Sequence, residues 1–579
     1  MSSDDEDYVI IQSPSSDIMS LPSLSSVPSR TPTPTPVQTV SRTIHDLEDN
    51  VMATIFRALS SVCKPFVAYG GYYDFGFILA SHVCVRWRVI ILACPDLWTG
   101  HVFAFPNHHA VLAILERTRN LPLDVKFTFD SASQPMTTWR SSLCLNLLPR
   151  TRTLEFSIMH GAVSRTDFHG LLTAIVAQGA PTLESLTIDQ FDLRAPDRSL
   201  YVELFAPNLC SLRLDGIFFP CLSRTLTTVQ VKLARSLRNA NDVLGVLRSA
   251  ADTLENVLID VVPDYYPYSV AQSHAFEAFR EDVHLPNAKV IAFRGRDAGL
   301  LDSLRTPPET FFSLSLTSAL GHVAEAMDDI FLSRVKDLLS WQCPCTISLN
   351  TVHEPARMSI LSLPPGGDVW HEQALTLVER SVEFVHGLHD HMSHRSTLPT
   401  QAAYPGLSIE WPDHSIVGRG EGQQLGTLLN PIRFAIESSE GNLFRSVRCL
   451  DISVPDDLLS TEWKQLLQGF TAVDTLRMHI ASTILLATLA THTSTLLPNL
   501  TTLVVVLDGM DDSKDHIEYH QPKLSAQRLT GLVIAYLEAG RENIIEFVRL
   551  EGKPESRLFA ETMRERLGAY VPRVEVMLD

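Results

Sequence analysis

The sequence lacks the long apolar runs and the positive charge that mark membrane-spanning and nucleic-acid-binding proteins. Its 579 residues contain no apolar run of about eighteen residues, the length that crosses a bilayer. Aspartate and glutamate total 66 against 47 lysines and arginines, which gives a formal charge of −19 at pH 7. Nucleic acids and anionic membranes are bound by clustered cations. We therefore expect neither a nucleic acid nor a membrane as a partner.

Cysteine is scarce, and its distribution does not indicate disulfide bonds. The nine cysteines are odd in number, dispersed and mostly set among apolar residues, which is typical of buried reduced thiols in an intracellular protein. The opening residues, Ser2-Ser-Asp-Asp-Glu-Asp7, have neither the basic nor the apolar region of a secretory signal. These features predict an intracellular location and leave cytoplasm and nucleus equally open.

Motifs of nucleotide-binding and hydrolytic enzymes are also missing. The segment Gly418-Arg-Gly-Glu-Gly422 lacks the glycine spacing of a dinucleotide loop and the Lys-Ser or Lys-Thr of a phosphate loop, so we interpret it as a flexible connection. The sequence contains no Gly-x-Ser-x-Gly elbow and no His-Glu-x-x-His helix. We therefore expect no catalytic residues and no bound cofactor.

Two groups of possible metal ligands have the wrong spacing for a metal site. Cys343-Pro-Cys345 has neither the two-residue gap of a zinc knuckle nor that of a redox motif, so both thiols are interpreted as structural. On one helix, the spacing of a histidine cluster would spread its members around the axis instead of gathering them on a face. The cluster consists of His386, His389, His391 and His394. We expect a polar helix end there and no metal.

Residues 1–42 differ in composition from the rest of the chain. They are rich in serine, threonine and proline, and such a segment buries too little apolar surface to offset its chain entropy, so we expect a disordered tail. Four hydroxyl residues precede proline and are candidates for proline-directed phosphorylation, with an unmodified tail as the alternative. They are Ser13, Thr31, Thr33 and Thr35.

One short apolar run in this tail directly follows four acidic residues. An acidic and apolar segment of this kind can add a strand to the sheet edge of a partner. The run consists of Tyr8, Val9, Ile10 and Ile11. It resembles motifs bound by SUMO and, through its aromatic-x-x-aliphatic form, motifs bound by the ubiquitin-like modifiers of autophagy. The alternative is a tail segment without a function.

Residues 44–103 have the pattern of a helical domain. Apolar residues recur at spacings of three and four along the first helix and form one stripe. The stripe consists of Ile44, Leu47, Val51, Ile55 and Leu59. A second apolar helix is predicted over 76–93. The segment 60–74, which contains two adjacent glycines, is predicted to be a loop between the helices.

The end of this domain is the most distinctive part of the chain. The segment Val83-Cys-Val-Arg-Trp-Arg-Val-Ile-Ile-Leu-Ala-Cys-Pro-Asp-Leu-Trp98 combines an Arg-Trp-Arg core with a terminal Pro-x-Leu-Trp. Together with the preceding apolar helix, it resembles the F-box of fungal F-box proteins. Their usual form is leucine-proline-x-glutamate, a helix, valine-cysteine-arginine-x-tryptophan and proline-x-leucine-tryptophan. In this chain Glu48 takes the place of the proline that usually follows the leucine at position 47.

The resemblance implies a module that docks on the Skp adaptor, and through it on the cullin, of a ubiquitin ligase. It implies that five residues are buried at or near that interface: Leu47, Val51, Ile55, Val83 and Trp87. A domain of this size has too small an interior to cover all its large apolar groups, so some must be covered by another surface. We expect Trp98 to pack inside the protein, where it would fix the boundary with the next domain.

Residues 104–579 repeat a different pattern, in which a proline precedes a leucine by two residues and a Leu-x-Leu strand follows. Strands of this kind are predicted within 121–129, 148–158, 180–188, 206–214, 251–259, 285–293, 444–452 and 497–505. Helices are predicted within 107–118, 168–178 and 242–250. Leu450, Leu476 and Leu503 are 26 and 27 residues apart, and Leu183 is 26 residues before Leu209, which lies in the range of leucine-rich repeats.

Each repeat has one apolar face that only a neighbouring repeat can cover, so the fold class predicted is α/β, with a helical F-box-like module followed by an irregular solenoid. The region 300–440 fits poorly: its strand-like segments, within 310–316, 346–349 and 407–411, are far apart. This architecture resembles F-box proteins with leucine-rich repeats.

The sequence thus predicts a non-catalytic substrate receptor of a Skp-cullin-F-box ubiquitin ligase, which recruits an unknown protein target through its repeat surface. One alternative is an interaction scaffold whose F-box-like unit only caps the solenoid. A second is an enzyme hidden in the irregular region 300–440.

Overall fold

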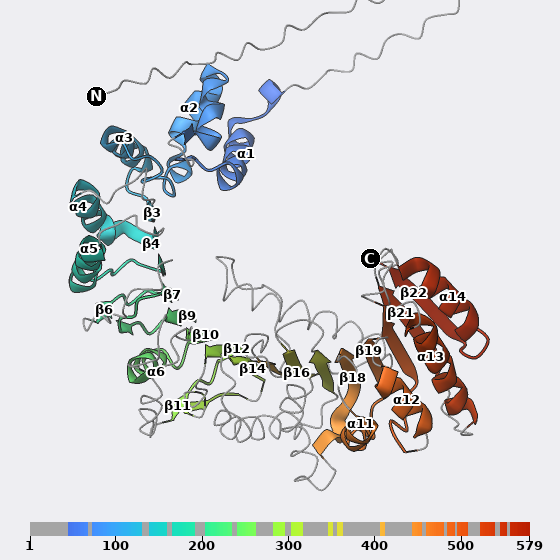
Figure 1. Ribbon diagram of the computed structural model, residues 1–579. Coiled ribbons are helices and arrows are strands. Elements are labelled where there is room, and N and C mark those ends of the chain that lie inside the picture. Colours follow the sequence, from blue (N-terminus) through green and yellow to red (C-terminus); the bar gives the residue numbers. More distant parts are fainter. Residues whose placement is uncertain are drawn as a thin grey trace, which may run out of the picture. The chain divides into compact units, whose positions relative to one another are not determined.

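The computed structural model divides the chain into two compact units, Met1–Met52 and Ala53–Asp579, and each is described by itself (Figure 1). In the first unit the structure describes residues 44–52. In the second it describes residues 53–67, 72–129, 138–158, 165–190, 203–233, 240–261, 282–295, 301, 303–307, 309–316, 345–350, 356–362, 406–411, 443–453, 459–479, 483–492, 495–507, 521–538, 545–552 and 556–578. The tail 1–42, with its predicted motif and phosphorylation sites, lies outside the described residues, so those predictions stay open.

The predicted helical domain consists of short helices and a small hairpin. A 3-10 turn, η1 (Ile44–Asp46), precedes α1 (Asp49–Val62), so the helix begins five residues later than the predicted stripe. The loop 60–74 contains the antiparallel pair β1 (Phe66–Val67) and β2 (Tyr73–Asp74). The prediction of one continuous helix over 76–93 is wrong. The segment is divided into a 3-10 helix, η2 (Gly76–His82), and α2 (Val85–Ala93), because Cys84 between them has extended backbone angles.

The sheet that follows is large, open and mostly parallel. Its strand order is β22-β21-β20-β19-β18-β15-β16-β17-β14-β12-β10-β9-β7-β5-β4-β3. The strands of its first part are β3 (Leu123–Phe129), β4 (Thr151–Ile158), β5 (Ser185–Gln190), β7 (Ser211–Asp215), β9 (Thr228–Leu233), β10 (Asn256–Val261), β12 (Val290–Gly295) and β14 (Phe311–Leu316). Each strand of this series pairs in parallel with the next one in the series. The predicted α/β class and the predicted strands of this part are confirmed.

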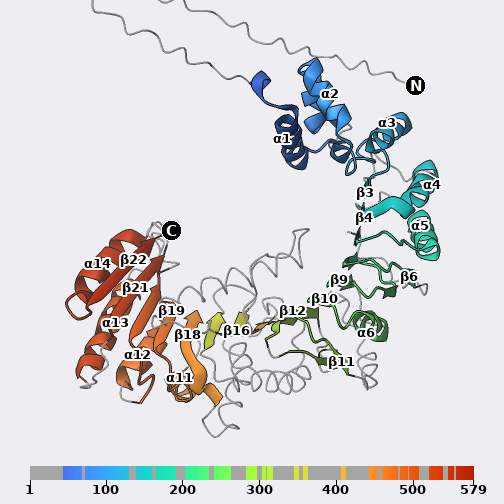
Figure 2. The ribbon, with the colours of Figure 1, turned by 180° about the vertical axis from the view of Figure 1, so that it is seen from behind.

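The second part of the sheet alternates strands and helices. Its strands are β18 (Val447–Ser453), β19 (Thr475–His479), β20 (Thr502–Val506), β21 (Phe547–Gly552) and β22 (Arg573–Leu578). The helices between them are α11 (Ser460–Leu467), α12 (Thr483–Thr491), α13 (Gln521–Glu538) and α14 (Arg557–Leu567), and each packs against the next (Figure 2). Such strand–helix–strand units place parallel strands side by side because the helix returns the chain to the end of the sheet at which the previous strand began.

The strand order is reversed only between β14 and β18. β15 (Cys345–Asn350), β16 (Ala356–Ser362) and β17 (Gly406–Trp411) are inserted as β17-β16-β15, and β16 is antiparallel to both neighbours. This is the region in which the sequence pattern is irregular. The reversal explains why the long spacings there match no repeat.

In the first part of the sheet, the segments that precede and connect the strands form helices, 3-10 turns and short strand pairs. The helices are α3 (His108–Thr118), α4 (Thr138–Leu147), α5 (Arg165–Gln178) and α6 (Ala240–Ser249). The parallel pairs are β6 (Leu204–Phe205) with β8 (Cys221–Leu222), and β11 (Val283–His284) with β13 (Leu304–Arg305). The structure also describes the 3-10 turns η3 (Pro95–Leu97) and η4 (Leu148–Arg150) in this part, and η7 (Leu443–Ser446) directly before β18. Of the helices that the structure describes, none has the length and apolar content to cross a bilayer.

The core follows the register of the sheet. One buried row runs through Leu154, Leu186, Leu212 and Val229, which are direct neighbours on adjacent strands. In the second part, Leu450 pairs with Leu476 and Leu476 with Leu503, as the 26- and 27-residue spacings predict. Burying each such side chain contributes about 1.5–3 kcal/mol, so the repeated leucines stabilise the sheet strand by strand.

A second ladder, of polar residues, joins the turns that precede the strands. A threonine or asparagine side chain in each turn donates a hydrogen bond to a main-chain carbonyl of the preceding turn. The pairs are Thr182 with Pro149 (3.1 Å), Asn208 with Pro181 (2.7 Å), Thr225 with Pro207 (3.0 Å), Thr253 with Arg224 (3.3 Å), Asn287 with Asp252 (2.6 Å) and Asn499 with Thr471 (2.8 Å). The ladder satisfies turn carbonyls that the strands leave unpaired. It also explains why threonine or asparagine stands between the proline and the leucine in the sequence pattern.

Candidate protein-interaction surfaces

The helices around the distinctive segment 83–98 leave many large apolar side chains exposed. Val83, Val85 and Val89 are exposed by 62%, 74% and 61%, while Ile90 and Ile91 beside them are buried. In α1, Val51 and Ile55 are exposed by 45% and 42%. Other exposed apolar residues of this region are Val62, Phe66, Tyr72, Tyr73, Phe75, Leu79 and Leu92. Large apolar side chains exposed in such number within a short region are typical of sites of interaction with other proteins.

Cys84 sets the direction of α2 and thus of its exposed valines. Its backbone is extended, with φ −155° and ψ 166°, and its Sγ accepts a hydrogen bond from the backbone N–H of Trp87 at 3.5 Å. The thiol therefore serves as the N-cap of α2, a position more often taken by serine or aspartate. The Val-Cys pair of the motif has a clear local role here: the cysteine begins the helix and the valine before it stays exposed.

Trp87 lies partly inside the helical region. It is half-buried, and its ring meets the ring of Phe56 edge to face at a centroid distance of 5.3 Å. Phe56 itself is buried. Of the residues assigned to the adaptor by resemblance, Trp87 and Leu47 are half-buried, whereas Val51, Ile55 and Val83 are exposed.

Trp98 is buried, as expected for a residue that packs inside the protein. It is 2% exposed, and its Nε1 donates a hydrogen bond to the carbonyl of Ile91 at 3.1 Å. The ring of Phe77 packs against it edge to face at 5.5 Å, and the Arg117 guanidinium lies 4.7 Å from the ring centroid. Trp98 thereby joins η2, α2 and α3, so the two tryptophans of the motif have different surroundings.

Asp96, at the variable position of Pro-x-Leu-Trp, is paired with Arg57. The Arg57 Nε donates a hydrogen bond to the carboxylate, and this contact together with the charge of Asp96 raises the pKa of Arg57. Both side chains are well exposed, so the pair contributes at most about 1 kcal/mol. Its effect is geometric, because it holds η3 against α1.

The segment after Trp98 covers the edge of the sheet. The Asp124 N–H of β3 donates to the carbonyl of Thr99 at 3.2 Å, and the rings of Phe103 and Phe127 lie 4.1 Å apart. The Arg140 guanidinium, which is buried, donates to the carbonyl of Phe105 at 3.1 Å. The predicted boundary at 103/104 is therefore a place of close packing within the second unit.

The sheet has a second candidate surface, because its strands place charged residues at the positions between the buried ones. Along the first strands, acidic and basic residues pair between neighbouring strands. The pairs are Asp124 with Arg152 (3.0 Å), Glu155 with Lys126, Asp189 with Arg213 (3.5 Å) and Asp215 with Lys232 (3.2 Å). Sequence reasoning located the strands but did not identify these charges; of the eight residues, only Arg213 is the middle residue of a Leu-x-Leu strand.

Asp260 is an exception in this series. It is 4% exposed, and neither carboxylate oxygen has a hydrogen-bond partner among the residues that the structure describes. Its register neighbours are Lys232 on β9 and Arg294 on β12. Burial raises the pKa of Asp260 to about 6, with Asp215 adding to the shift and Arg294 and Lys232 opposing it. A buried carboxylate without hydrogen bonds destabilises the folded state when it is charged.

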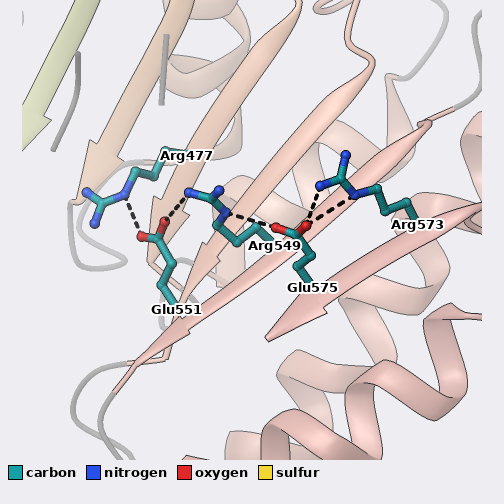
Figure 3. A network of polar contacts seen from close by, with 5 residues as sticks. All are labelled: Arg477, Arg549, Glu551, Arg573 and Glu575. Carbon is teal, nitrogen blue, oxygen red and sulfur yellow. Dashed lines mark hydrogen bonds and ion pairs between the residues drawn. The ribbon is translucent and has the colours of Figure 1, made fainter. Parts of the chain in front are cut away.

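At the other end of the sheet, charges of alternating sign form a chain from β18 to β22, and Figure 3 shows its members on β19, β21 and β22. Arg477 lies 3.4 Å from Asp451 and 2.9 Å from Glu551. Arg549 continues the chain to Glu551 at 3.8 Å and to Glu575 at 3.6 Å, and Arg573 pairs with Glu575 on the last strand. Charged groups that are already paired in this way order the surface, and they set which charges a protein partner could oppose.

The structure describes only some of the residues for which the sequence predicts no catalytic or metal site. The described segments contain no group of three or more histidine, cysteine, aspartate or glutamate residues arranged to hold a metal ion. The histidine cluster 386–394 and the glycine segment 418–422 lie outside those segments, as do Cys343 and the side chain of Cys345. The predictions made for them therefore stay open.

The prediction of buried thiols is wrong at two positions. All seven cysteines whose surroundings the structure describes are free, and Cys144, Cys221 and Cys449 are buried, but Cys63 and Cys210 are exposed. Burial raises the pKa of Cys144 and of Cys221 to about 12, which makes these thiols unreactive. The two exposed cysteines come from a loop region and a turn, where an apolar neighbourhood in sequence does not mean burial.

No protein-family model matches the chain, and no curated protein is significantly similar to it.

Proposed function

We propose that the protein is the substrate-recognition subunit of a Skp-cullin-F-box ubiquitin ligase. The observation that carries the proposal is the exposure of three valines at the position of the F-box-like motif: Val83, which precedes α2, and Val85 and Val89 within that helix. Full burial of one such side chain contributes about 1.5–3 kcal/mol, so a partner that covers several of them gains substantial affinity. The same surface in a free protein favours aggregation, which is a reason for it to have a partner.

The fold proposed for the rest of the chain is an irregular solenoid of leucine-rich-repeat type. Two features support it: the strand order follows the chain order outside β15–β17, and a polar ladder joins successive turns. Stacked repeats present one long strand face to a partner. We propose that the paired charges on this face contact the protein target.

The role in ubiquitin transfer is one of proximity. The receptor would hold the target close to an enzyme that other subunits carry, which raises the effective concentration of the target without bond chemistry in this chain. No cofactor is required for such a role.

Co-purification with a Skp adaptor tests the proposal. The full chain should recover the adaptor, and Val83→Glu should abolish recovery, because it places a charge on the exposed valine surface. Leu558→Glu is the matched control: it introduces the same charge at an apolar residue of α14 that is exposed by 73%. Recovery of no adaptor by the wild type, or equal recovery by both variants, would show that the ligase proposal is wrong.

A second candidate function is a scaffold in which the helical region only caps the sheet. The contacts of Thr99 with Asp124 and of Phe103 with Phe127 favour it, since they close the β3 edge. In that case Val83→Glu leaves the interaction partners unchanged, whereas removal of 44–103 unfolds or aggregates the chain. Affinity purification with mass spectrometry on both variants separates the two functions.

A further inference from the structure

The two edges of the large sheet differ in how they are covered. At β3, the Asp124 N–H is bonded to Thr99 and the Phe127 ring is packed against Phe103. At the other edge, β22 pairs with β21 on one side and with no described strand on the other. The outer N–H and C=O groups of such a strand are a template for pairing with another chain.

The side chains of β22 combine both charges on one face. Alternation along the strand places Arg573, Glu575 and Met577 on the face that carries the charge chain, and the valines between them on the other. The side chains of Arg573 and Glu575 are 61% and 33% exposed. Figure 3 shows Glu575 between two arginines, with Arg573 as the outermost charge of the chain. An acid and a base two residues apart at a sheet edge are complementary to their own antiparallel copy.

We propose that β22 pairs antiparallel with β22 of a second copy of this chain, with the two-fold axis at Val574. This register places Arg573 of each copy directly opposite Glu575 of the other, at a Cβ separation of about 4.5–5.5 Å. A centre at Arg573 or at Glu575 would instead place two like charges opposite each other, which is unfavourable. Of the three registers centred on residues 573, 574 and 575, only the one at Val574 pairs opposite charges, and the isologous contact closes after two copies.

The remaining residues of β22 are compatible with this pairing. Val574 meets its own copy across the axis, on the face opposite to that of the charges. Pro572, which has no N–H, then lies opposite Val576 at the end of the paired segment, and sheets tolerate proline at such positions. The alternative is that Pro572 and the two charges protect the edge from pairing, as they do in many monomeric proteins. The two possibilities predict different masses in solution.

Sedimentation velocity of the full chain at increasing concentration tests the proposal. We expect a dimer, with a dissociation constant of about 1–100 µM because one strand pair buries less area than a standard interface. Glu575→Arg and Arg573→Glu should each give a monomer. The double variant R573E/E575R should restore the dimer, because it exchanges the two charges, and it should not pair with the wild type. Glu116→Arg makes the same charge change as Glu575→Arg on an exposed residue of α3 and should leave the dimer intact.

A disulfide trap gives an answer that does not depend on the charge variants. Oxidation of Val574→Cys should form a covalent dimer, since the two cysteines would face each other across the axis, whereas Val576→Cys and the wild type should not. A monomeric wild type at about 100 µM, a dimer that persists in Glu575→Arg, or equal trapping of both cysteine variants would overturn the proposal. The inference is independent of the ligase proposal, because none of these experiments involves the adaptor.

Discussion

The guanidinium of Arg477 lies 2.9 Å from the Glu551 carboxylate, although β20 separates the strands that carry the two residues. Arg477 reaches across Val504, its register neighbour on β20, and also contacts Asp451 on β18. Burial lowers the pKa of Arg477, but the carboxylates of Asp451 and Glu551 raise it by more. The net shift is therefore upward, and the side chain stays charged. One side chain thus connects three strands of the polar face.

Replacement of Arg477 should destabilise the protein strongly. Arg477→Met keeps the apolar stem but leaves the carboxylate of Asp451, which is 1% exposed, without this cation. Removal of one partner of a buried ion pair costs about 3–5 kcal/mol. Arg573→Met, at the exposed end of the same chain of charges, should cost less than about 1 kcal/mol. Urea denaturation of both variants measures the difference, and equal midpoints would contradict a structural role for Arg477.

Asp260 should make stability depend on pH in the direction opposite to most carboxylates. Its pKa is raised to about 6 in the folded state, against about 3.9 in an unfolded chain. The folded state therefore binds the proton more tightly, and stability falls as the pH rises through the window between these values, by about 2–3 kcal/mol. The shift arises from burial first, with Asp215 in the same direction and with Arg294 and Lys232 opposed to it.

Comparison of the wild type with Asp260→Asn isolates this effect from other titrating groups. The free energy of unfolding of the wild type minus that of the variant should fall between pH 4 and pH 7, so the variant gains relative stability at neutral pH. Asp124→Asn is the control, because Asp124 is paired with Arg152 and partly exposed. A pH-independent difference for Asp260→Asn would show that the carboxyl titrates normally.

The strand pattern was predictable because the residues that carry it act locally. The turn leucines Leu183, Leu209 and Leu500 are buried, as are the apolar residues of the strands that follow them. Leu450, Leu476 and Leu503 likewise keep a spacing that can be read from the sequence and that the register reproduces. The order reversal at β15–β17 was not predictable in the same way. The order depends on which strands pair with β14 and with β18 across long stretches of sequence, and local spacing contains no information on that pairing.

The charged residues escaped prediction for a related reason. Arg477 and Glu551 are 74 residues apart in sequence, and their contact depends on the lateral order of β19, β20 and β21. Asp260 is no different from Asp215 in sequence context, since each follows an apolar strand residue, yet only Asp215 is bonded to a lysine.

Trp98 should contribute more to stability than Trp87. Trp98→Ala removes a buried ring that contacts Phe77 and Arg117, at a cost of about 3–5 kcal/mol. Trp98→Phe keeps most of the packing but loses the hydrogen bond to the Ile91 carbonyl, at a cost of about 1–3 kcal/mol. Trp87→Ala, at a half-buried position, should cost less than Trp98→Ala. Thermal unfolding followed by circular dichroism ranks the three, and a larger loss for Trp87→Ala would contradict the assignment of Trp98 to the interior.

Gly76 should not tolerate a side chain, because both its backbone angle and its surroundings exclude one. Its φ is +48°, and a Cβ would lie 2.6 Å from the carbonyl carbon of Lys64. The N–H of Gly76 is bonded to the Asp74 carboxylate at 2.7 Å, and that of Phe77 to the Cys63 carbonyl at 2.8 Å, so the turn has little freedom to move. Gly76→Ala should therefore cost about 1–3 kcal/mol and displace η2. Because the exposed Val83 lies at the end of η2, the variant should also recover less adaptor.

Gly100→Ala is the matched control, since a Cβ there meets no atom within 4 Å. Thermal unfolding and adaptor co-purification should both separate the two glycine variants, and equal behaviour in both would show that the turn at Gly76 does not set the position of the valine surface.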